Sequence, residues 1–270
     1  MSVLDIVMTT FNEDKTLLKR SLDSIMQQTY TDFQLILVLE PNDANTCFID
    51  EYALNNKQIV VIKNKQKLGF VASLNKGVKS STAKYIARLD TDDVCHPERL
   101  SKQVQYLEEN HDVDVLGAWV TYDDTSPVVR QYPENHNNIK DSFLLSNAIA
   151  HPVVVLKREL FKKFGYYDEL FVYSEDLELW LRLLAKGCRF HNLQESLLTY
   201  SIGRRNEKPK LDRVFIFQAR LRHNKDIYHY FPAMLSILIY KVLLFTPNNL
   251  FTLIKRILSK RIGDLYKERR

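Results

Sequence analysis

The sequence has few cysteines, and they are poorly placed for a covalent or metal framework. Its 270 residues include only three, Cys47, Cys95 and Cys188, which are widely spaced and odd in number. Disulfide scaffolds and structural zinc sites both need cysteines at closer and more regular spacings. The composition therefore predicts neither feature, and it fits a protein of the reducing cytoplasm.

Other common signatures are also missing. The first ten residues lack a basic segment and pass directly into an apolar run, so we expect no signal peptide. The sequence has no Walker-type loop, no Gly-x-Gly-x-x-Gly and no nucleophile elbow, which argues against kinases, ATPases, dinucleotide-binding enzymes and elbow-type hydrolases. An apolar stretch at residues 233–245 is shorter than the about 20 residues that span a bilayer.

Charge is divided unevenly along the chain. Residues 203–270 contain 16 Lys and Arg against 5 Asp and Glu, whereas the preceding residues are net acidic. A basic segment of this kind favours an anionic partner, either a nucleic acid or a phospholipid surface. Because no nucleic-acid-binding module is recognisable, we expect no nucleic-acid partner. Residues 250–262 place their apolar side chains on one face of a basic helix, which is typical of a membrane interface; packing on the rest of the protein is the alternative.

Strand-like and helix-like segments alternate over the first hundred residues. The expected strands are residues 3–8, 33–39, 59–62 and 85–89, and the expected helices between them are residues 17–28 and 71–79. Such alternation predicts an α/β fold with a mostly parallel sheet and helices on both faces. In such sheets ligands bind beyond the carboxyl ends of the strands, which is where Thr9, Glu40 and Asp90 fall.

The remainder of the chain divides near residue 202. The further expected elements are helices at 99–108 and 177–186, the second ending at Gly187, and strands at 113–122 and 153–156. Residues 123–138 are expected to form a loop over the sheet, and residues 201–211 a loop or linker before a helical C-terminus. We therefore predict a domain at 1–202 and a basic helical extension at 203–270.

Three carboxylates, Asp90, Asp92 and Asp93, follow the fourth expected strand. Adjacent anions repel one another, and a bound cation relieves the repulsion. Oxygen ligands suit Mg²⁺ or Mn²⁺, and Mg²⁺ is commonly held by only one or two protein carboxylates when substrate phosphates supply further oxygens. The alternative is an acidic turn in which Asp93 caps the next segment.

Five other positions each have two interpretations. Glu175 and Asp176 begin an expected helix, where a carboxylate either caps the helix or acts as a general base. Glu40 is either a turn residue or an acceptor for the imide N–H of a uracil or thymine. His151 is either a ligand or part of an ordinary turn, and Trp180 is either a core residue or a platform for a sugar ring.

Several motifs, taken in order, resemble glycosyltransferase family 2. They are residues 6–12 (IVMTTFN), 24–33 (SIMQQTYTDF), 68–77 (LGFVASLNKG), 85–93 (YIARLDTDD), 97–100 (PERL), 151–152 (HP), 165–169 (GYYDE) and 174–183 (SEDLELWLRL). The resemblance covers roughly residues 3–200, and the ordered set is far more specific than the acidic triplet alone. It implies a GT-A nucleotide-diphospho-sugar transferase fold, with further helices at the C-terminus.

On the donor side, the resemblance assigns roles by position. Thr9 and Glu40 match positions that hold the nucleotide base, with Glu40 standing where an Asp is more usual. Asp90 matches a residue near the ribose, and Asp92 matches the direct ligand of Mn²⁺ or Mg²⁺. One segment departs from the family pattern: residues 200–205 (YSIGRR) replace a Tyr-Arg-x-His-like segment, and Arg204 or Arg205 is the candidate to reach the diphosphate.

On the acceptor side, Asp176 matches the catalytic base and Glu175 its acceptor-orienting neighbour. We place His151 and Trp180 with the acceptor as well. In this scheme Asp176 removes the acceptor proton while the hydroxyl attacks the anomeric carbon from the face opposite the leaving group, so the configuration inverts.

The resemblance therefore implies a metal-dependent, inverting glycosyltransferase of bacterial capsule, O-antigen or lipooligosaccharide synthesis. It would transfer a sugar, from a UDP-sugar by preference, to a hydroxyl of a glycan or lipid-linked acceptor and form a β-linkage. We expect it at the cytoplasmic face of the membrane, held peripherally through its C-terminal helices. The alternatives are a catalytically silent scaffold subunit, which intact Asp90, Asp92 and Asp176 disfavour, and a nucleotidyltransferase, whose glycine-rich N-terminal loop is missing.

Overall fold

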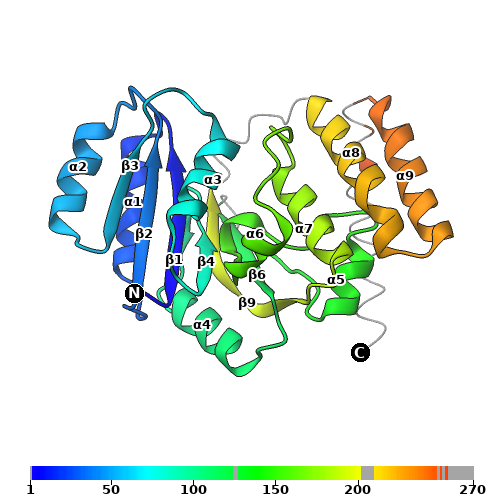
Figure 1. Ribbon diagram of the computed structural model, residues 1–270, viewed down its shortest axis with the longest axis horizontal. Helices are drawn as coiled ribbons and strands as arrows, with labels where there is room; N and C mark the ends of the chain where they lie inside the picture. The colour runs from blue at the N-terminus through cyan, green and yellow to red at the C-terminus, as the bar shows by residue number, and fades with distance from the viewer. Residues whose placement is uncertain (1, 124–126, 202–209, 248–249, 251–252, 255–270) are drawn as a thin grey trace.

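In the computed structural model, which describes residues 2–123, 127–201, 210–247, 250 and 253–254, the strands pair into one mixed sheet (Figure 1). Their order is β3-β2-β1-β4-β8-β6-β9-β5, with β7 beside β6.

The first half of this sheet is parallel. In the two pairings of β1, Leu4 lies opposite both Phe33 and Tyr85. β1, β2 and β4 are almost fully buried, as uninterrupted apolar runs predict for strands that are covered on both faces. The strands are β1 (Leu4–Thr10), β2 (Phe33–Leu39), β3 (Ile59–Lys63) and β4 (Tyr85–Arg88). The four strands expected in the first hundred residues are confirmed, with small differences at their ends.

The second half of the sheet changes direction. β8 is antiparallel to both β4 and β6, whereas β9 is parallel to β6 and antiparallel to β5. The strands are β5 (Val94–Cys95), β6 (Val115–Asp123), β7 (Val128–Arg130), β8 (Val155–Lys157) and β9 (Phe190–Ser201). β9 therefore brings its end, at Ser201, beside the short β5 that follows the acidic triplet.

Helices cover both faces of the sheet, as expected. Successive residues of a strand point to opposite faces, so Val7 packs in one core while Ile6 and Met8 pack in the other. Helices α1 (Lys15–Met26), α2 (Thr46–Asn55) and α4 (Arg99–Glu109) lie on the Ile6 face. Helices α3 (Phe70–Ser80), α5 (His136–Ser142), α6 (Glu159–Phe164) and α7 (Glu175–Ala185) lie on the Val7 face. A β-carbon at Gly77 of α3 would come within 2.6 Å of Val7, so this helix approaches β1 very closely.

Two further helices, α8 (Lys210–Ile227) and α9 (Tyr230–Leu244), form a hairpin beside α7 (Figure 1). Ile216 and Tyr240 belong to the same buried core as Leu181 of α7. Residues 210–244 are thus helical and share their core with the sheet domain, whereas the division of the chain near residue 202 stays a prediction. Among the described helices, none combines the length and the apolar character needed to cross a membrane.

Some expectations differ from the structure. Helices α2, α5 and α6 were not expected, and the loop expected at residues 123–138 contains β7 and the start of α5. Residues 202–209, with Arg204 and Arg205, lie outside the described part of the chain, as does most of the amphipathic segment at 250–262. The expected stop of α7 is confirmed, because Gly187 follows it with a φ of +79°.

Candidate active site

Thr9, Glu40 and Asp90 meet at one edge of the sheet. Thr9 lies near the end of β1, Glu40 directly follows β2, and Asp90 comes two residues after β4. Because β2, β1 and β4 are neighbours and run in parallel, their carboxyl ends lie together. The structure thus gathers the three positions that the sequence placed at strand ends.

Asp93 fixes the acidic turn to the far half of the sheet. It is buried, and its carboxylate accepts a hydrogen bond of 2.9 Å from the backbone N–H of Ser201, at the end of β9. Burial, and then the charge of Asp90, raise the pKa of Asp93 to about 9. The alternative in which Asp93 has a structural role is the one these contacts support.

Arg88, the last residue of β4, is a buried cation beneath the acidic turn. Its guanidinium pairs with the carboxylate of Asp90 and lies 5.4 Å from the ring centre of Phe70. The carbonyl of Arg88 accepts a hydrogen bond of 2.7 Å from Arg99. Because the guanidinium of Arg88 is buried, separating it from Asp90 would leave an uncompensated buried charge. Arg88 therefore orients Asp90.

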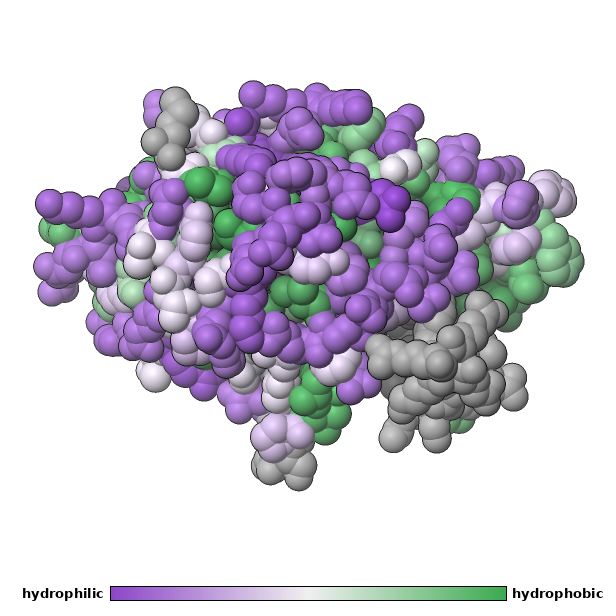
Figure 2. All heavy atoms as spheres, turned by 90° about the horizontal axis from the view of Figure 1, so that it is seen from below, coloured by the Kyte–Doolittle hydropathy of each residue, from purple (hydrophilic) through white to green (hydrophobic). Residues whose placement is uncertain are grey.

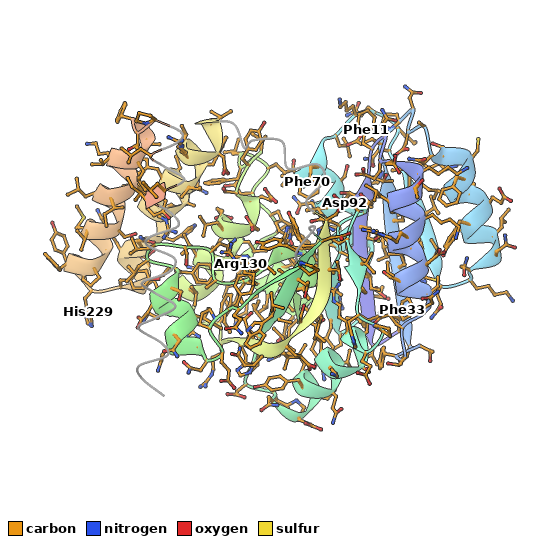
Figure 3. All side chains as sticks on the ribbon, turned by 180° about the vertical axis from the view of Figure 1, so that it is seen from behind. Phe11, Phe33, Phe70, Asp92, Arg130 and His229 are labelled. Carbon is orange, nitrogen blue, oxygen red and sulfur yellow. The ribbon has the colours of Figure 1, made fainter. Side chains whose placement is uncertain are left out.

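Asp92 is half-buried and lies at the same edge as Phe11 and Phe70 (Figure 3). In the described part of the chain, no three His, Cys, Asp or Glu side chains form a ready-made metal cluster. The donor set at this edge is instead a pair of carboxylates, Asp90 and Asp92, one of which is shared with Arg88. Such a pair fits a divalent cation that takes its remaining ligands from substrate phosphates.

Glu40 is buried and holds the loop before α3. Its carboxylate accepts hydrogen bonds from the backbone N–H groups of Leu68 (3.0 Å) and Gly69 (2.6 Å) and from the hydroxyl of Ser73 (2.9 Å). Burial acts to raise the pKa of Glu40, but the hydrogen bonds outweigh it and hold the pKa below its ordinary value. These contacts show a structural role, whereas contact with a nucleotide base stays a prediction.

An exposed aromatic ring completes this edge. Phe11 comes just after β1 and is 45% exposed. The ammonium of Lys67 lies 4.8 Å from the centre of its ring. An apolar ring is exposed here next to Thr9 and Thr10, which gives a flat surface against which another ring could stack.

His151 lies at the centre of a second group of side chains. It begins a short 3₁₀ helix at His151–Val153, and its Nε2 is 2.9 Å from the hydroxyl of Tyr167. Its Nδ1 lies 3.8 Å from the carboxylate of Glu175. The structure therefore joins His151 and Glu175, which the sequence placed together at the acceptor.

Trp180 is in the core and is not a sugar platform. Its side chain is fully buried, with no face open to a ligand. Its ring packs edge-on against those of His151 and Phe190, with centroids 6.1 and 6.3 Å away. Its predicted contact with the acceptor is thus corrected: α7 buries the face that carries Trp180, and the ring supports His151 from behind.

Asp176 lies in the first turn of α7 and is held in place. One carboxylate oxygen accepts a hydrogen bond of 2.8 Å from the side-chain amide of Asn147, and the other accepts one of 2.8 Å from the N–H of Leu177. Ser174, which precedes the pair Glu175-Asp176, has a φ of +54°. The carboxylate expected to act as a base is therefore oriented from both sides.

A backbone hydrogen bond connects the two groups. The N–H of Arg88, whose side chain pairs with Asp90, donates a bond of 3.0 Å to the carbonyl of Val154, directly after the short helix that His151 begins. Tyr167, which contacts His151, has a phenol whose pKa is raised by burial, lowered by the charge of Arg88 and raised further by the charges of Glu175, Asp176 and Asp90. The strand-end residues and the α7 residues are thus joined through β4 and the His151 segment.

Four residues of this site were not singled out in the sequence: Phe11, Arg88, Asn147 and Tyr167. Arg88 had a visible signal, because a charged residue inside a buried apolar strand needs a partner. Asn147 had none, since it falls in an irregular segment and acts on a residue 29 positions away.

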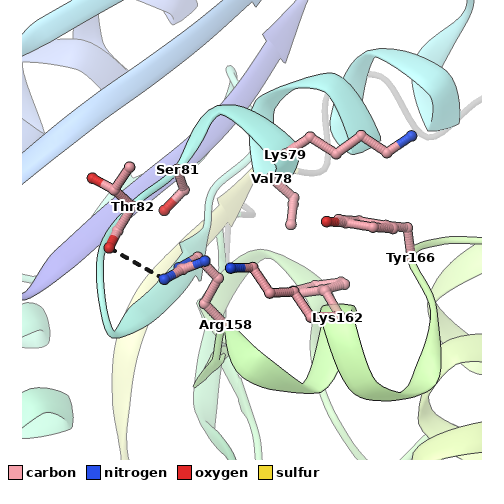
Figure 4. A pocket seen from close by; sticks show the side chains of 8 residues that line it. Val78, Lys79, Ser81, Thr82, Arg158, Lys162 and Tyr166 are labelled. Carbon is pink, nitrogen blue, oxygen red and sulfur yellow. Dashed lines mark hydrogen bonds between the residues drawn. The ribbon is translucent and has the colours of Figure 1, made fainter.

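A separate cavity of about 430 Å³ lies at the opposite edge of the sheet, between the end of α3 and the start of α6 (Figure 4). Arg158 is anchored there by the carbonyl of Thr82. The residues that line it are Val78, Lys79, Ser81, Thr82, Arg158, Phe161, Lys162 and Tyr166. None of them belongs to the site at the carboxyl edge.

The fold and the site together define a transferase of the GT-A type. The family model described as "Glycosyl transferase family 2" matches residues 5–164, more than half of the chain. The chain belongs to glycosyltransferase family 2.

Relatives with printed names support the same class. A glycosyltransferase of Methanocaldococcus jannaschii is 34% identical over 275 residues, covering 96% of this chain and 94% of the relative. The O-antigen biosynthesis glycosyltransferase WbnJ of Escherichia coli is 33% identical over 214 residues, covering 75% and 80%. A UDP-Gal:alpha-D-GlcNAc-diphosphoundecaprenol beta-1,3-galactosyltransferase of Escherichia coli is 27% identical over 213 residues, covering 75% of each chain. Relatives of this chain thus include enzymes of polysaccharide biosynthesis.

Two solved structures share the fold. Residues 1–349 of S. aureus TarS, in complex with UDP-GlcNAc, give a TM-score of 0.67 at 17% identity, covering 86% of this chain and 72% of that one. The mannosyltransferase PcManGT from Pyrobaculum calidifontis, in complex with GDP-Man and Mn²⁺, gives 0.64 at 14% identity, covering 97% and 75%. These likenesses confirm the expected GT-A fold.

Proposed function

We propose that the chain transfers a sugar from a UDP-sugar to a hydroxyl of a glycan or lipid-linked acceptor, with inversion at the anomeric carbon. An α-linked donor then gives a β-linkage. The observation that carries this proposal is the backbone link between the two groups of residues. Arg88, which pairs with Asp90, donates a hydrogen bond of 3.0 Å from its N–H to the carbonyl of Val154, next to the His151–Val153 helix that approaches Glu175. A single displacement requires the donor and the candidate base to be held close together in this way.

The donor edge, by which we mean Thr9, Phe11, Asp90 and Asp92, would hold the nucleotide. The exposed ring of Phe11 offers a stacking surface for the base beside Thr9. Asp92 would hold Mn²⁺ or Mg²⁺, which when bound neutralises charge on the leaving diphosphate, and Asp90 would lie toward the ribose. The ion pair with the buried guanidinium of Arg88 would orient Asp90 at this edge.

The acceptor side, by which we mean Asn147, His151, Tyr167, Glu175 and Asp176, would bind and deprotonate the attacking hydroxyl. The hydrogen bond from Asn147 keeps one oxygen of Asp176 in place as this residue takes the proton. Glu175, which faces His151, would hold the acceptor sugar in line with the donor.

Named relatives favour this substrate class. One acts, by its printed name, with UDP-Gal on a sugar attached to diphosphoundecaprenol and forms a beta-1,3 linkage. Another belongs to O-antigen biosynthesis. We therefore infer a role in surface-polysaccharide or glycolipid synthesis, at the cytoplasmic face of a membrane that the C-terminal helices contact peripherally, and with no nucleic-acid partner.

A thermal-shift screen tests the donor. UDP and UDP-sugars should raise the unfolding temperature in the presence of Mn²⁺, because a ligand that binds only the folded state stabilises it by mass action. Asp92→Asn should abolish the Mn²⁺-dependent part of the shift, whereas Asp112→Asn, at a carboxylate 60% exposed in a surface ion pair, should retain it. A preference for GDP-sugars would contradict the proposed donor.

Activity is then measured as UDP release in the presence of a lipid-linked saccharide. Release should require both the acceptor and Mn²⁺. Binding of UDP-sugar without any acceptor-dependent release, over a panel of acceptors, would instead favour a catalytically silent scaffold subunit.

A further inference from the structure

One face of α9 is apolar and uncovered. Phe231, at 75% exposed, and Phe245, just after the helix, at 85%, mark its two ends. The exposed residues, spaced alternately by four and three, are Phe231, Leu235, Leu238, Val242 and Phe245. This spacing places them along one side of a helix, and we call them the α9 stripe. The opposite side of α9 packs on the protein through Ile237, Tyr240 and Leu243.

The stripe is a large apolar surface for a protein exterior. Five bulky side chains in a row exceed the scattered single hydrophobic residues that are normal on surfaces. Figure 2 shows hydrophobic atoms gathered at the end of the molecule that α8 and α9 form. Such a surface indicates a partner that shields it from water.

The charges around the stripe favour an anionic lipid surface. The only charged residue of α9 is a cation, Lys241, and α9 contains no Asp or Glu. The α8–α9 hairpin, residues 210–244, contains 6 Lys and Arg against 2 Asp and Glu. Two copies of this chain would bring two basic hairpins together and repel each other, whereas a negatively charged bilayer attracts each of them.

The length of α9 excludes a membrane-spanning arrangement. Its 15 residues extend about 22 Å, and the hydrocarbon core of a bilayer is about 30 Å thick. A helix of this length with an apolar stripe, in a basic hairpin, is instead suited to lie in the plane of the interface.

We propose that the α9 stripe inserts into the surface of an anionic phospholipid bilayer with the helix axis parallel to the membrane. This deepens the peripheral location proposed above, but it stands on the exposed residues of α9 and not on the transfer reaction. It also moves the main contact from residues 250–262, where the sequence placed it, to residues 231–245.

Vesicle co-sedimentation tests this surface. The full chain should bind vesicles of phosphatidylglycerol and phosphatidylcholine more strongly than vesicles of phosphatidylcholine alone. Leu238→Asp should weaken binding by about tenfold or more, because it removes one buried leucine and adds an anion. The matched control is Leu54→Asp, which changes an 84% exposed leucine of α2 and should leave binding unchanged. Both leucines are exposed in the lipid-free protein, and Leu238 would be buried only in the bilayer, so both variants should keep the unfolding temperature of the wild type.

Three results would overturn the proposal. The first is equal binding of wild type and Leu238→Asp to anionic vesicles, and the second is equal binding of wild type to anionic and neutral vesicles. The third is a lipid-free dimer in sedimentation velocity that Leu238→Asp dissociates, since a second copy would then occupy the stripe. UDP release plays no part in these measurements, so a failed transfer assay leaves this test intact.

A different observation concerns Ser174, the residue before Glu175. It adopts a left-handed backbone conformation, with φ +54° and ψ +29°, which is unfavourable for a residue other than glycine. Its hydroxyl donates a hydrogen bond of 2.6 Å to the carboxylate of Asp212 in α8, and both residues are buried. The first turn of α7 is therefore set by a contact from the C-terminal hairpin.

We infer that Asp212 is a positioning residue for the acceptor side. By holding Ser174 in its left-handed conformation, it sets the orientation of the first turn of α7, which carries Glu175 and Asp176. α8 is further joined to α7 by the bond of 2.9 Å between His223 and the buried Glu178. Asp212 touches no substrate in this scheme and acts only through Ser174.

Kinetics separate this role from a general loss of stability. Asp212→Ala should lower kcat by about ten- to a hundredfold, since small misplacements of a reacting group are costly, and leave KM for the UDP-sugar unchanged. Asp212→Asn keeps an oxygen acceptor for Ser174 and should restore most of the lost kcat.

This inference rests on the proposed function, and the two fail differently. If the wild type releases no UDP with any acceptor, the proposed function fails. If the wild type is active and Asp212→Ala matches it in kcat, only the positioning role fails. Equal defects in Asp212→Ala and Asp212→Asn would also overturn it, because the acceptor oxygen would not be what matters.

Discussion

The donor edge and the acceptor side are built in different ways. Donor-edge residues lie at the ends of neighbouring parallel strands, so their positions follow from the pairing of β2, β1 and β4. Acceptor-side residues come from separate segments and are held by side-chain contacts. Tyr167, for example, exchanges two backbone hydrogen bonds with the buried side chain of Asn75, 92 residues earlier.

Because of this difference, substitutions should affect the geometry of the two sides unequally. A strand end is stabilised by the whole sheet, so one substitution there removes a functional group but leaves the backbone in place. A side chain held by one or two distant residues depends on each of them. We therefore expect remote substitutions to affect the acceptor side more than the donor edge.

The largest expected effect sharpens this division. Asp176→Asn should lower kcat by about 10²- to 10⁴-fold, because it removes the general base, and leave UDP binding intact. Asp168→Asn is the matched control: it alters a carboxylate of the same region that pairs with Arg222, and it should keep most of the activity. Kinetics of UDP release and UDP titration measure both quantities. Near-normal turnover of Asp176→Asn would show that Asp176 is not the general base.

A middle-sized effect, on stability, is expected at Glu40, which lies beside the donor edge at the end of β2. Glu40→Gln should lower the free energy of unfolding by about 1–3 kcal/mol, because an amide cannot accept all the bonds that Leu68, Gly69 and Ser73 donate. Denaturant unfolding measures this, with Glu51→Gln on the exposed side of α2 as the control.

The same variant carries a pH dependence. The pKa of Glu40 lies below its ordinary value of 4.5 in the folded protein, so the ionised carboxylate stabilises the fold fully at pH values above 4.5. This stabilisation is lost as the pH falls through the pKa of the folded protein, where the carboxylate becomes protonated. The stability difference between wild type and Glu40→Gln should thus be large at pH 7 and shrink below pH 4.5. A difference independent of pH would contradict the role of the carboxylate charge.

The smallest expected effect is on acceptor binding when Trp180 is replaced. Because this side chain is fully buried, Trp180→Phe should leave KM for the acceptor unchanged while lowering the unfolding temperature. A selective rise in KM with normal stability would show that the indole reaches the acceptor, and the boundary of the acceptor side would then have to include it.

Much of the fold could be predicted from the sequence because its signals are local. The buried runs of β1, β2 and β4 and the apolar spacing of α1 and α3 depend only on residues within each element. α2 escaped prediction because it buries a single residue, Ile49, and so shows almost no periodic pattern. β9 escaped because shifts in register against β6 interrupt its alternation.

In the candidate site, too, residues in local motifs could be predicted and residues that act through distant contacts could not. Asp90, Asp92 and Asp176 could be proposed from the sequence, because each lies in a short motif that carries the family resemblance; their roles stay predictions. Asn147 and Asp212 could not, because their importance lies in which residue they touch, 29 and 38 positions away. The opposite error occurred at Trp180, whose motif position suggested a ligand contact that burial excludes.

The shared core of α7 and the α8–α9 hairpin has a practical consequence for dividing this chain. The family model ends at residue 164, and the charge pattern changes near residue 202, so either point invites truncation. A chain cut at either place would uncover the apolar side of α7 or remove that helix altogether, since Ile216 and Tyr240 pack in the same core as Leu181. The exposed surface would promote aggregation. The smallest piece of this protein that folds well therefore extends through α9, beyond the segment that identifies its family.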